Sequence, residues 1–140
     1  MLVNDTFRMV GIDKDKFYQT LRTMGKDGLS PSATKKMRDE WSKDNPTRNY
    51  CYMVSEFIYK YIAPKGVKHL KLKVKGEGAT HHFLKWGDGT IVDLTAEQFG
   101  FKLDYSKARG ASFLNPRPYG VAKNTRRFAE LMGFENPILK

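Results

Sequence analysis

The stretch over residues 49–62 constrains the fold most, because its apolar residues recur at helical spacing. Two sets of them step by four along the chain: Met53, Phe57 and Tyr61, and Val54, Ile58 and Ile62. Together they form a wide apolar band, which is typical of a helix that is buried on most sides. The run Ala63-Pro64-Lys65-Gly66 then breaks the helix. The sequence therefore predicts a mostly buried central helix.

Cys51 is the only cysteine of the chain, and it lies at or near the start of this predicted helix. The unpaired N–H groups and the dipole at a helix N-terminus favour a thiolate over a thiol. A single cysteine excludes an internal disulfide and any metal cage built from several cysteines. It also fits a reducing, intracellular setting, so we expect a cytoplasmic protein.

Length and charge bound the class of protein. A chain of 140 residues suits one domain, and 40% hydrophobic with 29% charged residues is ordinary for a globular protein. No apolar run approaches the roughly 20 residues needed to span a bilayer, and no secretory signal is evident, so no membrane partner is predicted. The net charge of +10 favours an acidic partner, such as nucleic acid or an acidic protein, or a solvated basic surface.

The remaining pattern predicts an α+β fold with helices at the N-terminus and the central helix packed on a small antiparallel sheet of about three to five strands. The expected helices cover residues 13–24, a surface segment opened by Ser30-Pro31, and residues 121–132, where Phe128, Leu131 and Met132 are apolar. The expected strands cover residues 67–74, 80–86 and 90–94, with a short one within 110–114. The run over residues 95–98 matches a capping box.

Three lysines, Lys71, Lys73 and Lys75, alternate with apolar residues in the strand over residues 67–74. This row favours an edge strand that is protected against aggregation, although it could also contact phosphates.

A hairpin joins the strands that carry His81, His82 and Asp93. If Gly87-Asp88-Gly89 forms a three-residue loop, Phe83 opposes Asp93 and His81 shares the face of Asp93. If the loop is only Asp88-Gly89, His82 lies beside Asp93 instead. A slip of one residue exchanges the two histidines, and the pattern alone leaves both registers open.

Cys51, one of these histidines and Asp93 are the types of residue that a cysteine nucleophile, its base and an orienting carboxylate require. Each also has a structural interpretation: a buried apolar cysteine, a hydrogen-bonded histidine, and a carboxylate that caps the turn at Thr95. His81 and His82 point to opposite faces of a strand, so they cannot chelate one metal together. No metal and no cofactor is predicted.

These residues resemble the papain-like cysteine fold in its NlpC/P60 and transglutaminase-like form, and more narrowly the YunG-like proteins of bacteria and their phage relatives. The matching pieces are Trp41, Asn45-Pro46-Thr47, the six residues from Cys51 to Glu56, residues 81–85 and residues 89–99, with a weaker match over residues 109–114. This coverage begins near Trp41. The resemblance does not cover residues 1–32. We expect them to form an N-terminal helical extension of a single domain over residues 1–140.

The resemblance implies a papain-like α+β fold and a Cys51-His81-Asp93 triad, because it aligns His81 with the family histidine. It implies a peptidase, amidase or transglutaminase-like enzyme acting on a protein or peptide-like amide. Asn49-Tyr50 replaces the residues that usually precede the cysteine. Backbone N–H groups at the helix start, with Asn45 or Asn49, would then bind the oxyanion. The alternative is a basic binding module without turnover, for nucleic acid or an acidic partner protein, which the lysine row and the basic last helix with Lys123, Arg126 and Arg127 suggest. The resemblance to phage proteins further implies a phage factor that acts on a component of a bacterial host.

Overall fold

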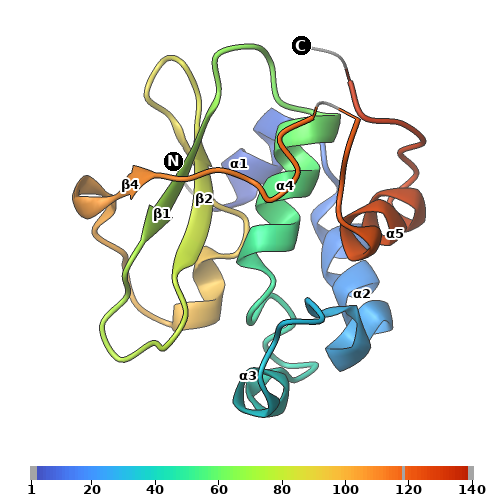
Figure 1. Cartoon of the computed structure of the whole chain (residues 1–140), viewed down its shortest axis with the longest axis vertical. Helices are drawn as coiled ribbons and strands as arrows, with labels where there is room; N and C mark the ends of the chain where they lie inside the picture. The colour runs from blue at the N-terminus through green and yellow to red at the C-terminus, as the bar shows by residue number, and fades with distance from the viewer. Residues whose placement is uncertain (1–2, 118, 139–140) are drawn as a thin grey trace.

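A computed structural model describes residues 3–117 and 119–138, and the chain has an α+β architecture (Figure 1). Across these residues there are five α-helices: α1 (Val3–Val10), α2 (Lys14–Met24), α3 (Lys35–Glu40), α4 (Cys51–Tyr61) and α5 (Lys123–Leu131). Four strands, β1 (Lys68–Leu72), β2 (His81–Lys85), β3 (Ile91–Val92) and β4 (Arg109–Gly110), form one antiparallel sheet in the order β3-β2-β1-β4.

Helix α4 lies between the sheet on one side and α2 with α5 on the other (Figure 1). Phe57 of α4 is fully buried, and its ring packs edge-on against Phe128 of α5 with centroids 5.0 Å apart. Phe128 in turn packs edge-on against Phe17 of α2 at 5.8 Å. The predicted buried central helix is confirmed. Its apolar band is wide because the helix packs against the sheet on one side and against helices on the other.

The N-terminal helices belong to the same hydrophobic core as α4. Asp13 caps α2, since its side chain accepts the Asp15 N–H at 3.0 Å, and the helix over residues 13–24 is confirmed. The sequence did not predict α1, whose Phe7 packs edge-on against Phe17 at 5.0 Å. Residues of α1 and α2 therefore build the core rather than lie outside it.

The second helix begins later than predicted. Ser30 and Pro31 lie before the helix, and Thr34 caps it by accepting the Met37 N–H at 3.2 Å. The prediction from Ser30-Pro31 was wrong because the threonine, which satisfies an N–H of the first turn, determines where α3 starts. Trp41 follows α3, is buried, and donates its indole N–H to the Pro46 carbonyl at 2.9 Å.

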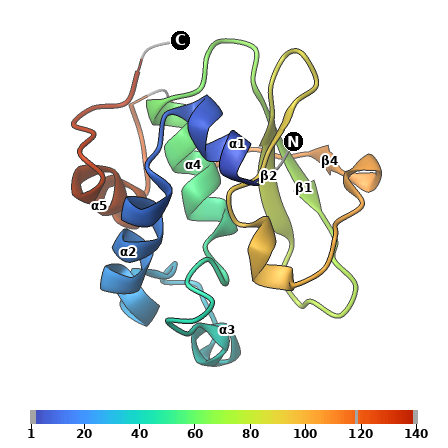
Figure 2. The same cartoon turned by 180° about the vertical axis from the view of Figure 1, so that it is seen from behind.

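Strand β1 is not an edge strand, which corrects the interpretation of the lysine row. It pairs with β2 along its whole length, and β4 covers its other edge at Leu70 and Lys71. On the sheet face opposite α4, the segment over residues 96–108 covers a smaller cluster (Figure 2) that contains the buried residues Leu72, Val74, Phe83 and Leu103.

The hairpin between β2 and β3 has the three-residue loop. Leu84 pairs with Val92, and the Trp86 N–H donates to the Thr90 carbonyl at 2.8 Å. Gly89 has a φ of 92°, a conformation that glycine adopts without a steric penalty. This register excludes the two-residue alternative and places His81, not His82, on the side of Asp93.

Two predictions for the second half of the chain are wrong in detail. Thr95 does not cap the 3₁₀ helix η2 (Ala96–Phe99) with its side chain; instead the Gln98 amide donates to the Thr95 carbonyl at 3.0 Å. The short strand expected within residues 110–114 is instead β4 at Arg109–Gly110, and of the expected range only Gly110 belongs to it.

Candidate active site

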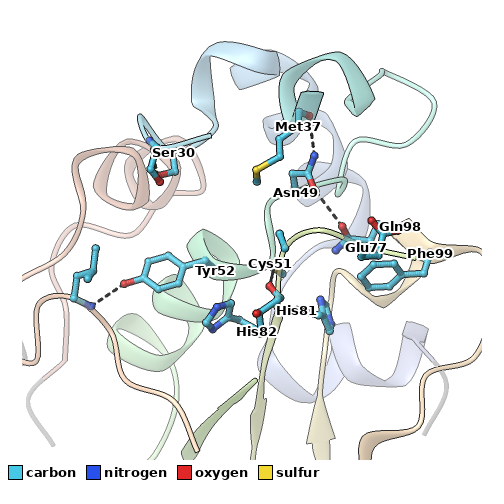
Figure 3. Close-up of a pocket in the computed structure, with 14 residues that line it drawn as sticks. Ser30, Met37, Asn49, Cys51, Tyr52, Glu77, His81, His82, Gln98 and Phe99 are labelled. Carbon is cyan, nitrogen blue, oxygen red and sulfur yellow. Dashed lines mark hydrogen bonds between the residues drawn. The ribbon is translucent and has the colours of Figure 1, made fainter. Parts of the chain in front are cut away.

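Cys51 is the first residue of α4 and is partly exposed at the wall of a cavity of about 360 Å³ (Figure 3). No side chain caps this helix. The first hydrogen bond along α4 runs from the Val54 N–H to the Tyr50 carbonyl at 3.0 Å, so the N–H groups of Cys51 and Tyr52 precede the helical ladder. The sulfur lies 3.8 Å from the Thr80 carbonyl oxygen, to which the thiol donates.

His81 and Asp93 form a buried pair beside this cysteine. The His81 Nε2 lies 2.6 Å from Oδ2 of Asp93. The same carboxylate oxygen accepts the Tyr105 hydroxyl at 2.7 Å, and Oδ1 accepts the Thr95 hydroxyl at 3.4 Å. Three donors therefore converge on one buried carboxylate.

The charge state of His81 follows from these contacts. Burial lowers the pKa of His81, but the hydrogen bond with Asp93 and the interaction with Cys51 outweigh burial and raise that pKa to about 9. The other ring nitrogen, Nδ1, is buried and has no hydrogen-bond partner within the described part of the chain. His81 thus has one nitrogen fixed by Asp93 and the other free for a proton transfer.

His82 lies in a different environment. Its Nδ1 is 2.8 Å from Nε2 of His69, and its ring meets the Tyr52 ring edge-on at 5.2 Å. Burial is the main cause that lowers the pKa of His82 to about 4 and that of His69 to about 3. Both rings are therefore neutral at pH 7, and the structure brings only His81 to Asp93.

The two asparagine amides expected to help bind an oxyanion are used elsewhere. The Asn49 amide donates to the Met37 carbonyl at 2.7 Å and to Glu40 at 3.2 Å. The Asn45 amide donates to the Gln98 carbonyl at 3.0 Å. This corrects the expectation for both residues and leaves the N–H groups at the start of α4 as the donors near Cys51.

Gln98 and Tyr105 are site residues that pattern reasoning did not assign. The Gln98 side-chain oxygen accepts the Asn49 N–H at 3.0 Å and so holds the chain just before Cys51, where Asn49 has a φ of 64°. Gln98 also lines the cavity (Figure 3). The sequence did contain a signal for Gln98, because the Gln98-Phe99 pair is part of the family resemblance. Nothing in the local sequence of Tyr105 indicates its bond to Asp93.

The basic residues that suggested an acidic partner lie on separate elements. Lys73 and Lys75 follow β1 and are exposed, and Lys123 and Arg127 are exposed on α5. Helix α4 separates β1 from α5 (Figure 1).

Among residues 3–117 and 119–138, no three His, Cys, Asp or Glu side chains gather as metal ligands. In the same part of the chain, no helix has the length and apolar character to cross a bilayer.

The architecture and the Cys-His-Asp arrangement define an α+β protein with a candidate nucleophile at the head of its central helix. The model of the YunG protein family matches residues 15–132, so this chain belongs to the YunG family. The match starts within α2, well before the motifs that begin at Trp41. Neither a search of curated proteins nor a search of solved structures found a match.

Proposed function

We propose that this chain is a cysteine-dependent acyl-transfer enzyme in which Cys51 is the nucleophile, His81 the acid and base, and Asp93 the group that orients His81. The bond of 2.6 Å between His81 Nε2 and Asp93 carries the proposal, because it fixes the ring and leaves Nδ1, which has no hydrogen-bond partner in the described part of the chain, to exchange a proton with Cys51. The similarity to the papain-like fold, with its cysteine at a helix head and its histidine on a strand, belongs to the same proposal.

In the proposed reaction, the Cys51 thiolate attacks an amide carbonyl and forms a carbon–sulfur bond. The N–H groups that start α4 stabilise the oxyanion. When the carbon–nitrogen bond breaks, the amine leaves with the proton from His81 Nδ1 and a thioester remains. His81 then takes a proton from the acceptor, which attacks the thioester and releases the thiolate. Water as acceptor makes the protein a peptidase or amidase; an amine makes it a transferase.

The proposal predicts that His81, but not its neighbour His82, controls the reactivity of Cys51. Alkylation by iodoacetamide at pH 7, followed by intact-protein mass spectrometry, measures this reactivity. We expect His81→Gln to slow alkylation by at least about tenfold, since it removes the cation that pairs with the thiolate. His82→Gln is the matched control and should stay near the wild-type rate. Cys51→Ser should not be alkylated.

An alkylation rate in His81→Gln equal to that of the wild-type protein would refute the triad. Circular dichroism of each variant checks that its fold is retained. The basic binding module gives a different result: binding of nucleic acid that weakens steeply with salt and is the same in Cys51→Ser as in the wild-type protein.

A further inference from the structure

Tyr105 and His81 donate hydrogen bonds to the same oxygen of Asp93. The Tyr105 hydroxyl lies 2.7 Å from Oδ2 and the His81 Nε2 lies 2.6 Å from it, whereas Oδ1 accepts the longer bond of 3.4 Å from Thr95. Two donors at one oxygen draw on the same negative charge, so a stronger bond to one of them weakens the bond to the other. Tyr105 is therefore placed to change how strongly Asp93 interacts with the His81 ring.

The surroundings of Tyr105 fix its hydroxyl at this oxygen. Tyr105 begins the 3₁₀ helix η3 (Tyr105–Lys107), which Asp104 caps by accepting the Ser106 N–H at 3.1 Å. The Tyr105 ring packs edge-on against the buried Phe83 ring with centroids 4.8 Å apart, and the His81 ring stacks on Phe83 at 6.0 Å. One buried phenylalanine thus contacts both donor rings and limits their movement.

The groups around His81 differ in their effect on its proton. They are Cys51 at the start of α4, Asp93 just after β3, His82 in β2, Phe99 in η2 and Tyr105 in η3. Burial lowers the pKa of His81, but Asp93 and Cys51 outweigh burial and raise that pKa to about 9. The His82 ring is neutral at pH 7 and Phe99 is apolar. Tyr105 completes this set, and it influences the His81 ring through the Asp93 carboxylate.

The Tyr105 hydroxyl favours the neutral form of His81. Burial and the Asp93 carboxylate raise the pKa of Tyr105, so the phenol keeps its proton and acts as a donor. A hydroxyl binds a carboxylate oxygen most strongly when no other strong donor shares the negative charge of that oxygen. A protonated His81 ring takes a larger share of this charge than a neutral ring. The Tyr105 bond is therefore stronger once His81 has lost its proton.

This difference affects the acid step of the proposed reaction. His81 transfers the Nδ1 proton to the leaving amine, while the Nε2–H stays bonded to Oδ2 of Asp93. A proton that is held too strongly is transferred slowly, because a general acid works best when its pKa lies near the working pH. The Tyr105 bond strengthens as the proton leaves and so stabilises the product of the transfer.

We propose that Tyr105 is a positioning residue that weakens the interaction of Asp93 with the protonated His81 ring, and so makes His81 a stronger acid toward the leaving group. The inference rests on the proposed function for the use of that proton. The geometry that carries it is the shared oxygen, which accepts donors from two separate elements, β2 and η3, at 2.6 and 2.7 Å.

The test removes the Tyr105 hydroxyl and measures the proton on His81. NMR of ¹⁵N-labelled imidazoles gives the pKa of His81 in the wild-type protein and in Tyr105→Phe. We expect Tyr105→Phe to raise the pKa of His81, so that the ring binds its proton about three- to tenfold more tightly. The pH dependence of Cys51 alkylation by iodoacetamide is a second measurement, and its upper inflection should move to higher pH.

Tyr61→Phe is the matched control. The Tyr61 hydroxyl is also buried, but it has no hydrogen-bond partner in the described part of the chain, and Tyr61 is the last residue of α4, at the opposite end from Cys51. Removal of this hydroxyl should leave both the pKa of His81 and the alkylation profile unchanged. Circular dichroism of the two variants checks that each keeps its fold.

The direction of the change separates the inference from a purely structural role. If Tyr105 only supports Asp93 mechanically, its loss loosens the pair of His81 and Asp93, and the pKa of His81 falls. A fall or an unchanged pKa in Tyr105→Phe therefore overturns the inference, as does an equal rise in Tyr61→Phe. These results leave the acyl-transfer proposal standing, because that proposal depends on whether His81→Gln slows the alkylation of Cys51.

Discussion

Asp93 has two roles that looked like alternatives in the sequence. Its carboxylate accepts a hydrogen bond from the His81 ring of β2 at 2.6 Å. It also accepts one from the hydroxyl of Thr95, two residues further along, at 3.4 Å. A carboxylate has about four lone-pair sites, so a local turn contact and a long-range pair can coexist. Tyr105 fills a further site at 2.7 Å. The local contacts help to hold the carboxylate in the position where it meets the histidine.

The choice between His81 and His82 shows how much of the site can be predicted from residue patterns. Alternation along β2 places the two rings on opposite faces, but a one-residue change of register exchanges them. The structure decides the matter through the loop that contains Gly89. Tyr105 could not be found in this way, because it lies in an irregular segment without periodicity, and only tertiary packing brings it to Asp93.

The three histidines of the chain should titrate far apart. We expect an apparent pKa of about 9 for His81, about 4 for His82 and about 3 for His69, because Asp93 stabilises the first cation and burial disfavours the other two. NMR of ¹³C-labelled or ¹⁵N-labelled imidazoles measures all three. Asp93→Asn should lower the value for His81. A pKa near 9 at His82 would contradict the site geometry.

The same shift predicts how stability depends on pH. The pKa of His81 is raised above the unfolded value of 6.5, so the folded state binds its proton more tightly. The stabilisation from this pair is complete below about pH 6.5 and is lost as the pH rises through about 9. Urea unfolding of wild-type protein and His81→Gln across this interval should show two curves that converge toward high pH.

At the scale of elements, long periodic segments were predictable and short ones were not. The central helix follows from its own apolar spacing. The position of β1 does not, because the strand that covers its edge is only Arg109–Gly110, and the short strand predicted within residues 110–114 gave no indication of which strand it would pair with. The lysine row of β1 was consequently interpreted as the mark of an edge strand, although β1 has neighbouring strands on both sides.

The hairpin loop offers a matched test of its geometry. Gly89 has a φ of 92°, whereas Gly87 has no positive φ and only an ordinary contact, 3.9 Å, at its Cβ position. We expect Gly89→Ala to lower the free energy of unfolding by about 1–2 kcal/mol, since alanine is strained in this conformation. Gly87→Ala should be nearly neutral. Urea unfolding measures both, and equal effects would contradict the assigned loop.

At the scale of the whole molecule, α4 joins two layers that are built from distant parts of the sequence. Its contacts to β2 hold the Cys51 end near His81, and its contacts to α5 connect it with α2 and the N-terminal residues. The family motifs begin near Trp41, yet the family match starts at residue 15. Helix α2 is thus covered by the family match and shares the core that carries the site.

Truncation of one N-terminal core residue should therefore destabilise the site. Phe17 of α2 is fully buried between Phe7 and Phe128, so we expect Phe17→Ala to cost about 3–5 kcal/mol. Met9, which is 38% exposed, is the control, and Met9→Ala should cost far less. Thermal unfolding followed by circular dichroism, together with Cys51 alkylation, measures both effects. An unchanged midpoint in Phe17→Ala would indicate a separate N-terminal extension.

Cys51 is the only thiol of the chain and is open to a cavity. A peroxide that converts its sulfur to a sulfenic acid therefore meets no resolving cysteine within the same molecule. The oxidised form must be rescued by a small thiol such as glutathione or by another protein; otherwise it proceeds to the irreversible sulfinic state. In a cell under oxidative stress, the protein thus depends on its surroundings to keep its sulfur reduced.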